Sequence, residues 1–240
     1  MAVTLYKYDD VGAPQLTGEV GKVISVLDAC LVNGYGSKSP AGWTKPFSGT
    51  NKAVYRPPAG NRHYLRILND NTTIDNYGNT AVGICRVIGY ETMSDVNTGT
   101  GLFPTTAQIS GGVCLHTTYD RSATIKPWWL IADDKTFYFI PLYDTRCFGF
   151  CFGSFYSYVN NDNYNTVIIG HINASRGSHL SYNSAPGSIT LAMYMPRRWD
   201  QQSISIQCSK LNVSGLGVSG QYSGTGQSFL YPSPITGSLS

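Results

Sequence analysis

Apolar and polar residues alternate with a period of two along most of the chain after His63, and this alternation limits the fold more than any other feature. Successive side chains of a β-strand point to opposite faces, so this period predicts strands. Clusters of Gly, Asn, Asp and Ser separate the alternating segments, as turns require. The predicted strands are His63–Leu68, Ala81–Glu91, Val113–Thr118, Trp128–Ala132, Thr136–Leu142, Cys147–Ser157, Thr166–Ile172, Ser188–Met195 and Ser203–Cys208. The sequence therefore predicts a mainly β domain, sandwich-like or irregular.

One segment near the N-terminus has the period of an α-helix instead. Its apolar residues form a single stripe at helical spacing, made of Val20, Val23, Ile24, Leu27, Cys30 and Leu31. We expect one α-helix over residues 19 to about 32. Thr17 or Gly18 is the expected cap at its start, and Asn33-Gly34 is the expected stop.

The stretch 34–51 is dense in Gly, Pro and Ser, and we expect it to be irregular, with Trp43 and Phe47 as anchors. The two predicted strands on either side of Asp133-Asp134 are expected to form a tight hairpin, because Asp bonds locally at turns. Both strands are apolar on both faces. Such strands lie in the centre of a sheet or face a partner.

Charged residues make up 13% of the chain, which has two glutamates but 17 tyrosines and 26 glycines. Scarce Glu argues against a helical protein. A charge-poor surface rich in Tyr, Ser, Asn and Gly is typical of contact surfaces, although tyrosines also fill strand faces. The net charge of +3 is scattered, and the densest basic site is Arg197-Arg198 beside Trp199. We therefore expect no nucleic-acid partner.

The sequence also indicates the compartment. The N-terminal MAVTLYKYDD lacks the apolar core of a secretory signal, and no apolar run approaches the ~20 residues that span a bilayer, so we expect no membrane association. Synthesis in a reducing cytoplasm predicts free, mostly buried thiols rather than a disulfide framework. The cysteines are Cys30, Cys85, Cys114, Cys147, Cys151 and Cys208.

The motif FGFCFG (148–153) places three phenylalanines on one strand face and the small residues Gly149, Cys151 and Gly153 on the other. A small face predicts the close approach of another layer or chain. GFCFG also has the shape of a nucleophile elbow, but that motif needs a helix after it, and SFYSYVNNDN is not helical.

We expect no catalytic residue, no cofactor and no metal site. The histidines lack ligand spacing. Asp95 opens DVNTG, which has the opening rhythm of a calcium loop without the later acidic ligand, so an Asx-rich turn is the favoured interpretation. Paired carboxylates of a glycosidase meet only in the fold, so the sequence does not decide on them.

We expect a single β-rich domain over residues 1–208, followed by an uncharged arm rich in Gly, Ser and Pro over residues 209–240. No charged residue follows Lys210, yet the segment keeps large apolar side chains, unlike a typical disordered tail. We interpret it as an extended arm that is ordered by contact with a neighbour, the other interpretation being a flexible terminus. The candidate interface residues are Leu216, Val218, Phe229, Leu230 and Tyr231.

Four stretches resemble a family of virion structural proteins encoded by tailed bacteriophages and prophages. They are VISVLDACLVNGYGSKSPAGWTKPFSGTNKAVYR (Val23–Arg56), GYETMSDVNTGTGLFPT (Gly89–Thr105), PWWLIADDKTFYFIP (Pro127–Pro141) and FGFCFGSFYSY (Phe148–Tyr158). Order and spacing match from about Thr4 to about Tyr231, and relatives continue past the segment that matches LYPSP. The resemblance implies a virion protein of the capsid, collar, tail or baseplate, without enzymatic activity. It implies other virion proteins as partners and a homo-oligomer in a symmetric assembly, after synthesis in the host bacterial cytoplasm.

Two other functions compete with a structural role. A host-receptor or glycan-binding module at a tail tip would use exposed aromatic rings, and the candidates are Trp43, Trp128, Trp129 and Trp199. A groove lined by exposed tryptophans would favour it, and burial of all four would count against it. A wall- or capsule-degrading hydrolase would instead bring two carboxylates together in a cleft.

Overall fold

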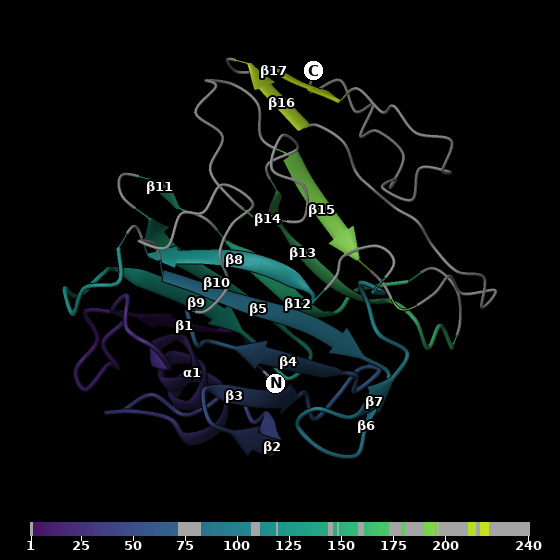
Figure 1. The fold of residues 1–240 in the computed structure, drawn as a ribbon, viewed down its shortest axis with the longest axis horizontal. Coiled ribbons are helices and arrows are strands. Elements are labelled where there is room, and N and C mark those ends of the chain that lie inside the picture. Colours follow the sequence, from purple (N-terminus) through teal and green to yellow (C-terminus); the bar gives the residue numbers. More distant parts are fainter. Residues whose placement is uncertain are drawn as a thin grey trace.

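Two β-sheets pack face to face in the computed structural model and form a β-sandwich, with one short helix beside it (Figure 1). The structure describes residues 2–71, 83–106, 111–118, 120–143, 146–147, 149–157 and 161–172, and further along the chain residue 196 and the strands 179–180, 190–194, 211–214 and 217–220. The mainly β class expected from the alternation is confirmed.

Sheet I has seven strands in the order β1-β9-β10-β12-β13-β15, and β11 pairs with β10. Every pairing in it is antiparallel. Its strands are β1 (Thr4–Lys7), β9 (Trp128–Ala132), β10 (Thr136–Tyr143), β11 (Arg146–Cys147), β12 (Phe150–Ser154), β13 (Thr166–Ile172) and β15 (Thr190–Tyr194). The strands β9 and β10, which are apolar on both faces, lie inside the sheet, as expected of such strands.

Sheet II has six strands in the order β14-β8-β5-β4-β3-β2, and β14 joins β8 in parallel. Its strands are β2 (Thr44–Gly49), β3 (Lys52–Arg56), β4 (Tyr64–Leu68), β5 (Gly83–Tyr90), β8 (Val113–Thr118) and β14 (His179–Leu180). Two small hairpins complete the structure, β6 (Thr92–Met93) with β7 (Gly99–Thr100), and β16 (Leu211–Ser214) with β17 (Gly217–Gly220).

The core between the sheets is aromatic. Phe137 has ring contacts with Trp43, Phe150 and Phe152 at centroid distances of 5.3, 5.3 and 6.4 Å. Phe103 stacks on Phe152 from the side of sheet II, with ring planes 16° apart. These rings are fully or almost fully buried, and aromatic pairs of this kind add stability beyond their buried area.

The helix is shorter and begins later than the sequence predicts. It consists of α1 (Lys22–Leu27), continued by a π-helical segment η1 (Asp28–Asn33). Its N-cap is Gly21 rather than Thr17 or Gly18, and the cap makes no side-chain hydrogen bond. Instead the Val23 N–H donates to Asn69 Oδ1 at 3.0 Å. A side chain distant in the sequence therefore accepts one of the backbone N–H groups that have no partner within the first turn of the helix. Sequence spacing alone does not reveal such a partner.

The predicted end and the predicted apolar stripe of the helix agree better with the structure. Gly34 terminates the helix at φ 77°, as the Asn33-Gly34 pair indicates. The stripe is buried at Val23, Leu27, Cys30 and Leu31 and partly buried at Ile24, whereas Val20 lies before the helix and is 42% exposed. Val26 joins the buried set. Tyr55 of β3 fixes the helix to sheet II, because its hydroxyl donates to Asp28 Oδ1 at 2.9 Å.

Most predicted strands are present with bounds close to those expected, and the hairpin around Asp133-Asp134 is confirmed. Asp133 Oδ1 accepts the N–H groups of Lys135 and Thr136, both at 2.8 Å. The predicted strand Cys147–Ser157 is instead two strands, β11 and β12, and it ends at Ser154. The predicted strand Ser203–Cys208 lies outside the described residues.

Strand β2 lies in the stretch 34–51 that the sequence indicates to be irregular, so this prediction is wrong over Thr44–Gly49, whereas residues 34–43 are irregular as expected. A register shift between Thr44 and Phe47 interrupts its pairing with β3, and Pro46 sits at the interruption. Proline is tolerated at bulges and on edge strands, and β2 is an edge strand of sheet II. The bulge breaks the period of two, which hides the strand from a pattern search. Trp43 and Phe47 are packed as expected.

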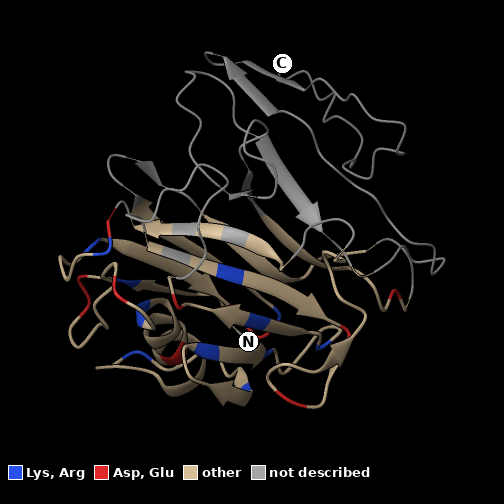
Figure 2. Cartoon of the chain, viewed as in Figure 1, with Lys and Arg blue, Asp and Glu red and all other residues tan. Residues whose placement is uncertain are grey.

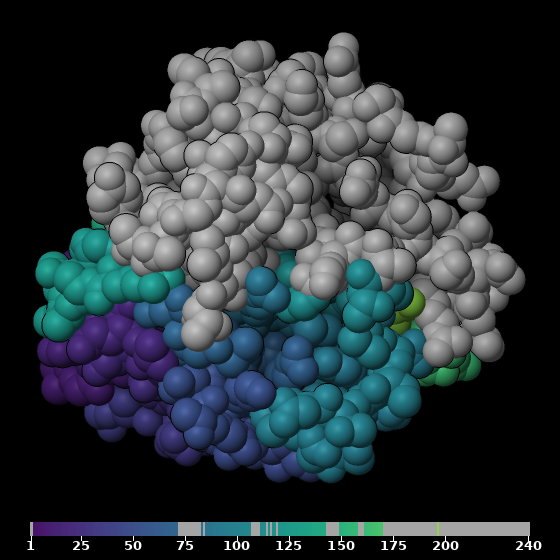
Figure 3. All heavy atoms as spheres, viewed as in Figure 1, coloured from purple at the N-terminus to yellow at the C-terminus, as the bar shows by residue number. Residues whose placement is uncertain are grey.

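Charge is distributed unequally over the two sheets (Figure 2). Lysine and arginine occur in β3, β4 and β5 of sheet II. The sequences of β9, β10, β12, β13 and β15 in sheet I contain no Lys, Arg, Asp or Glu. In space-filling view, sheet II and the β6–β7 hairpin form a continuous surface (Figure 3). Sheet I is therefore the apolar layer of the sandwich.

Candidate functional site

The side of sheet I that faces away from the core carries apolar side chains, and we call it the outer face. On each strand these residues alternate with core residues such as Leu130, Phe139 and Phe152. The apolar residues of the outer face are Leu5, Trp129, Ile131, Tyr138, Ile140, Cys151, Val167 and Ile169, and the same alternation places Lys7 and Thr136 on this face toward the ends of β1 and β10. A sheet face in contact with water normally carries polar residues in these positions. The outer face therefore has the composition of a contact surface.

One row of cross-strand partners runs through the centre of the outer face. Leu5 of β1 pairs with Ile131, which pairs with Tyr138, and the row continues through Cys151 to Ile169. Five strands at about 4.8 Å spacing make the row about 19 Å wide. Leu5 is 45% and Tyr138 42% exposed, while Cys151 is 3% exposed. The row therefore presents its largest exposed groups on either side of Ile131.

Two aromatic side chains lie beside the outer face and pack against it. The ring of Tyr8 meets Trp129 edge-on at 5.8 Å, and the ring of Phe155 meets Tyr138 edge-on at 6.5 Å. Tyr8 is itself 39% exposed, so it extends the apolar surface beyond β1. Tyr and Trp are enriched at interfaces, because they combine a large apolar area with a polar tip.

The central row of the outer face carries no charged group near physiological pH. Burial raises the pKa of Tyr138, and the adjacent Cys151 raises it further. Burial also raises the pKa of the Cys151 thiol to about 12, against a hydrogen bond from Tyr138 that lowers it. Both groups therefore stay protonated and uncharged. At the edge, Lys7 lies 3.4 Å from Asp9, so its charge is partly balanced.

The other side of sheet II is built differently. The β6–β7 hairpin packs on it, where Met93 joins Val54, Ile88 and Tyr90 in a second apolar cluster. The guanidinium of Arg66 lies 5.6 Å from the Tyr90 ring. The two outward sides of the sandwich therefore differ. The outward side of sheet II is covered by a hairpin and carries basic groups, whereas the central row on the outer face of sheet I is apolar and uncharged.

One of the small residues of the FGFCFG motif, Gly153, is explained by the chain's own neighbouring strand. A side chain on Gly153 would collide with Lys135 O and Thr136 Cα of the adjacent β10, so the chain's own backbone occupies that space. Cys151 lies between Tyr138 and Ile169 in the row of the outer face. The expectation of a second layer here is therefore wrong at Gly153, where a neighbouring strand accounts for the glycine.

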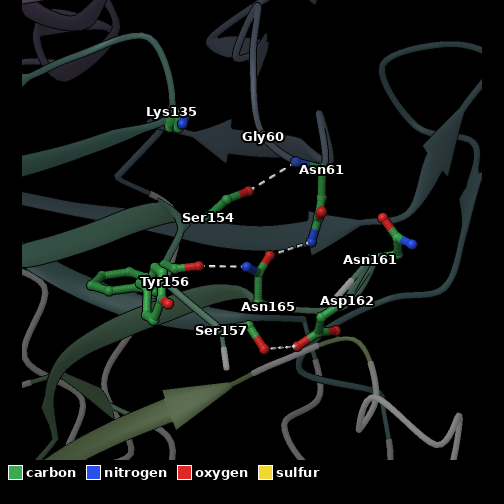
Figure 4. Close-up of a pocket in the computed structure, with 10 residues that line it drawn as sticks. Gly60, Asn61, Lys135, Ser154, Tyr156, Ser157, Asn161, Asp162 and Asn165 are labelled. Carbon is green, nitrogen blue, oxygen red and sulfur yellow. Dashed lines mark hydrogen bonds between the residues drawn. The ribbon is translucent and has the colours of Figure 1, made fainter. Parts of the chain in front are cut away.

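A polar pocket of about 400 Å³ lies next to sheet I (Figure 4). Three separate segments form it, namely the turn after β3, the β9–β10 turn, and the end of β12 with the loop before β13. Its lining residues are Gly60, Asn61, Lys135, Ser154, Phe155, Tyr156, Ser157, Asn161, Asp162 and Asn165. No local motif links these segments, so the pattern of the sequence does not reveal the pocket.

Hydrogen bonds between its lining residues hold the pocket in shape. The Asn61 side chain donates to Asn165 Oδ1 at 2.6 Å, and its backbone N–H donates to Ser154 Oγ at 3.0 Å. Asn165 donates in turn to the carbonyl of Phe155. The Asp162 carboxylate accepts the Ser157 hydroxyl at 2.8 Å. The polar side chains are therefore positioned without a ligand.

The candidate interface residues in the C-terminal arm are not brought to either site by the described structure. Val218 lies in β17, where it is the cross-strand partner of Val213. Leu216, Phe229, Leu230 and Tyr231 lie outside the described residues. A short hairpin, β16–β17, thus forms the described part of the arm.

The three tryptophans within the described residues do not gather into one exposed groove. Trp43 and Trp128 are buried, and their indole N–H groups donate to Asp133 O at 2.8 Å and to Pro14 O at 3.0 Å. Trp129 is half-buried on the outer face, and Trp199 lies outside the described residues. Two of the four tryptophans are therefore buried, so the condition that would count against a glycan groove, burial of all four, is met only for Trp43 and Trp128.

The residues weighed as a catalytic nucleophile or as metal ligands lie in regular strands and turns. Cys151 lies in the middle of β12, so no strand-turn-helix elbow exists at this position. Asp95 Oδ1 accepts the N–H groups of Asn97 and Thr98 at 2.6 and 3.0 Å, which makes an Asx turn in the β6–β7 hairpin. Within the described ranges, no group of three or more His, Cys, Asp or Glu is placed to hold a metal ion.

Two further findings concern membrane-spanning helices and similarity to known proteins. Among the helical residues that the structure describes, none belongs to a helix long and apolar enough to cross a membrane. Comparisons with protein-family models, with curated proteins and with solved structures gave no match.

Proposed function

We propose that the chain is a non-catalytic structural component of a tailed-bacteriophage particle and that it acts through contacts with neighbouring particle proteins. The resemblance of Val23–Arg56 and Gly89–Thr105 to virion structural proteins supports the assignment to a particle. The outer face of sheet I supports a role in protein contacts. It is the single observation that carries the proposal, because Leu5 and Tyr138 are 45% and 42% exposed on a sheet face whose other central residues are also apolar.

The expected occupant of the outer face is a second copy of the chain. A surface that packs on its own copy must not repel itself, and the central row from Leu5 to Ile169 contains no charged residue. A charged partner protein would instead require complementary charges on this face. Two sheets packed face to face lie about 10 Å apart, a spacing that side chains such as Tyr138 and Leu5 fill.

The energy of such a contact is sufficient for assembly. Complete burial of each large apolar side chain contributes about 1.5–3 kcal/mol. Leu5 and Tyr138 keep almost half of their surface exposed in the isolated chain, and Tyr8 and Trp129 add to the patch. A symmetric assembly uses the contact many times, so a modest energy for each pair suffices.

Lysine substitutions on the outer face test the proposal. In Leu5→Lys and Tyr138→Lys, burial of the face would place an unpaired ammonium in an apolar contact, which costs several kcal/mol. Val11→Lys is the matched control, because Val11 is 89% exposed in a loop and gains the same charge. The readout is the number of chains per purified particle, measured by quantitative mass spectrometry after complementation of a phage that lacks the gene.

We expect the two outer-face variants to fold, as judged by circular dichroism, and to be incorporated at least about tenfold less than Val11→Lys. Incorporation of both outer-face variants at the level of the control would refute contact through this face. Absence of the wild-type chain from particles would refute the structural role itself.

A further inference from the structure

We propose that the polar pocket beside sheet I is a binding site for a neutral saccharide of one or two sugar units. The proposal goes beyond a structural role, because it gives the chain a ligand. Its volume of about 400 Å³ lies in the range of small-molecule sites, toward the lower end. The chemistry of the lining decides which class of small molecule fits.

The pocket offers hydrogen-bonding groups of the kind that sugar hydroxyls require. A carboxamide has two N–H donors and one acceptor oxygen. Asn61 uses one donor for Asn165, which leaves its Oδ1 and its second N–H for a ligand. Asn165 uses one donor for Phe155 O and its acceptor for Asn61, which leaves one N–H. Each sugar hydroxyl both donates and accepts, so such mixed sets suit it.

These groups are fixed before a ligand arrives. The bonds from Asn61 to Ser154 and Asn165 join the turn after β3 to the end of β12. Gly60 allows the close approach, because a Cβ there would lie 2.6 Å from Ser154 Oγ. Rigid polar groups lose little entropy when a ligand binds, and weakly bound ligands such as sugars depend on this.

An aromatic ring borders the polar groups. Tyr156 is 83% exposed, and Figure 4 shows it on the opposite side of the pocket from Asn161. The C–H-bearing face of a sugar ring packs on an aromatic ring, while the hydroxyls at its edge point to hydrogen-bonding groups. An exposed ring at the border of a pocket lined by carboxamides therefore matches the two kinds of surface that a sugar presents.

The charges in the pocket favour a neutral ligand. Lys135 and Asp162 are its charged lining residues, one of each sign. The Asp162 carboxylate already accepts hydrogen bonds from Ser157 and from the Tyr164 N–H, at 2.8 and 2.9 Å. A phosphate or nucleotide would need several cations, and a cationic ligand would need spare carboxylates. A neutral saccharide requires neither.

Two substitutions and one matched control test the site in the full-length protein. Tyr156→Ala removes the exposed ring. Asn161→Gly removes a carboxamide at a left-handed position, φ 58°, which glycine adopts without strain. Asn51→Gly is the control, because Asn51 has φ 56° in the turn between β2 and β3, outside the pocket. The probes are the methyl glycosides of glucose, galactose, mannose and N-acetylglucosamine and their disaccharides, with binding measured by saturation-transfer NMR and titration.

We expect at least one probe to bind with a Kd below about 10 mM. Its affinity should fall at least about tenfold in Tyr156→Ala and several-fold in Asn161→Gly, and it should be unchanged in Asn51→Gly. The proposal is overturned if no probe binds, or if Tyr156→Ala and Asn161→Gly bind as the wild type does. Circular dichroism confirms that each variant is folded.

Discussion

At the scale of the residue, His63 is the clearest case of a polar side chain that is buried although it would gain from contact with water. It is 7% exposed, and its ring meets Phe103 edge-on at 6.0 Å. Within the described part of the chain, its Nδ1 has no hydrogen-bond partner. Burial lowers its pKa from 6.5 to about 4, with a smaller contribution from Arg56 and against the opposing effect of Glu91. His63 is therefore neutral in the folded protein at pH 7.

This pKa predicts a loss of stability in mild acid. Between pH 6.5 and about 4 the unfolded chain binds a proton at His63 that the folded chain does not, so the free energy of unfolding falls as the pH falls. The displacement of the pKa corresponds to about 3 kcal/mol at 1.36 kcal/mol per unit. We expect His63→Gln to weaken the pH dependence of urea unfolding between pH 7 and 4.5. An identical dependence in the variant would show that His63 is not the group responsible.

At the scale of the element, most of the longer strands were predictable, and β2 and β3 are two that were missed. β4 alternates between intermediate and buried residues and was found within one residue of its bounds. β3 has Ala53, Val54 and Tyr55 all buried, so its pattern carries no period of two. Its neighbour β2 is interrupted by a bulge. In β2 and β3 the period of two is lost, in one to a bulge and in the other to burial on both sides, and a search for alternation therefore misses them.

The end of the helix gives a prediction at this scale. Gly34 has φ 77° and ψ 171°, a region that residues with a side chain adopt at a cost of about 1–3 kcal/mol. A Cβ there would also lie 2.6 Å from Lys38 O. We expect Gly34→Ala to lower the free energy of urea unfolding by at least that amount. The control is Gly49→Ala, where a Cβ would meet Val96 Cγ1 at an ordinary 3.6 Å.

Gly49→Ala should change stability by less than about 0.5 kcal/mol, because its new methyl group meets no backbone. Equal effects of the two substitutions would contradict the assignment of Gly34 to a strained position that requires glycine.

At the scale of the whole molecule, the sandwich has two unlike outer sides, and this asymmetry was only partly predictable. The sequence indicates that β9 and β10 are apolar on both faces, and their second face is the outer face. The polar pocket was not predictable, because Asn61, Lys135 and Asn165 are far apart in sequence and meet only in the fold. Local patterns identify faces of strands, whereas pockets depend on how turns are brought together.

The C-terminal arm gives a prediction at the scale of the molecule. The residues of the main core cluster all precede Thr190, so deletion of Leu211–Ser240 removes none of them. We expect the truncated chain to keep the circular dichroism and unfolding midpoint of the wild type. Its incorporation into particles should be lost, because the uncharged arm is proposed to contact a neighbouring chain. Incorporation of the truncated chain at wild-type copy number would show that the arm is dispensable for assembly.

The most direct measurement is a cryo-electron microscopy reconstruction of intact particles of the kind to which the proposal assigns the chain. The proposed structural role predicts density for the β-sandwich in several copies related by the symmetry of the particle. It also predicts that the row from Leu5 through Tyr138 to Ile169 is buried against a neighbouring copy. A particle without density for the chain, or with the outer face of sheet I open to solvent in every copy, would contradict the account.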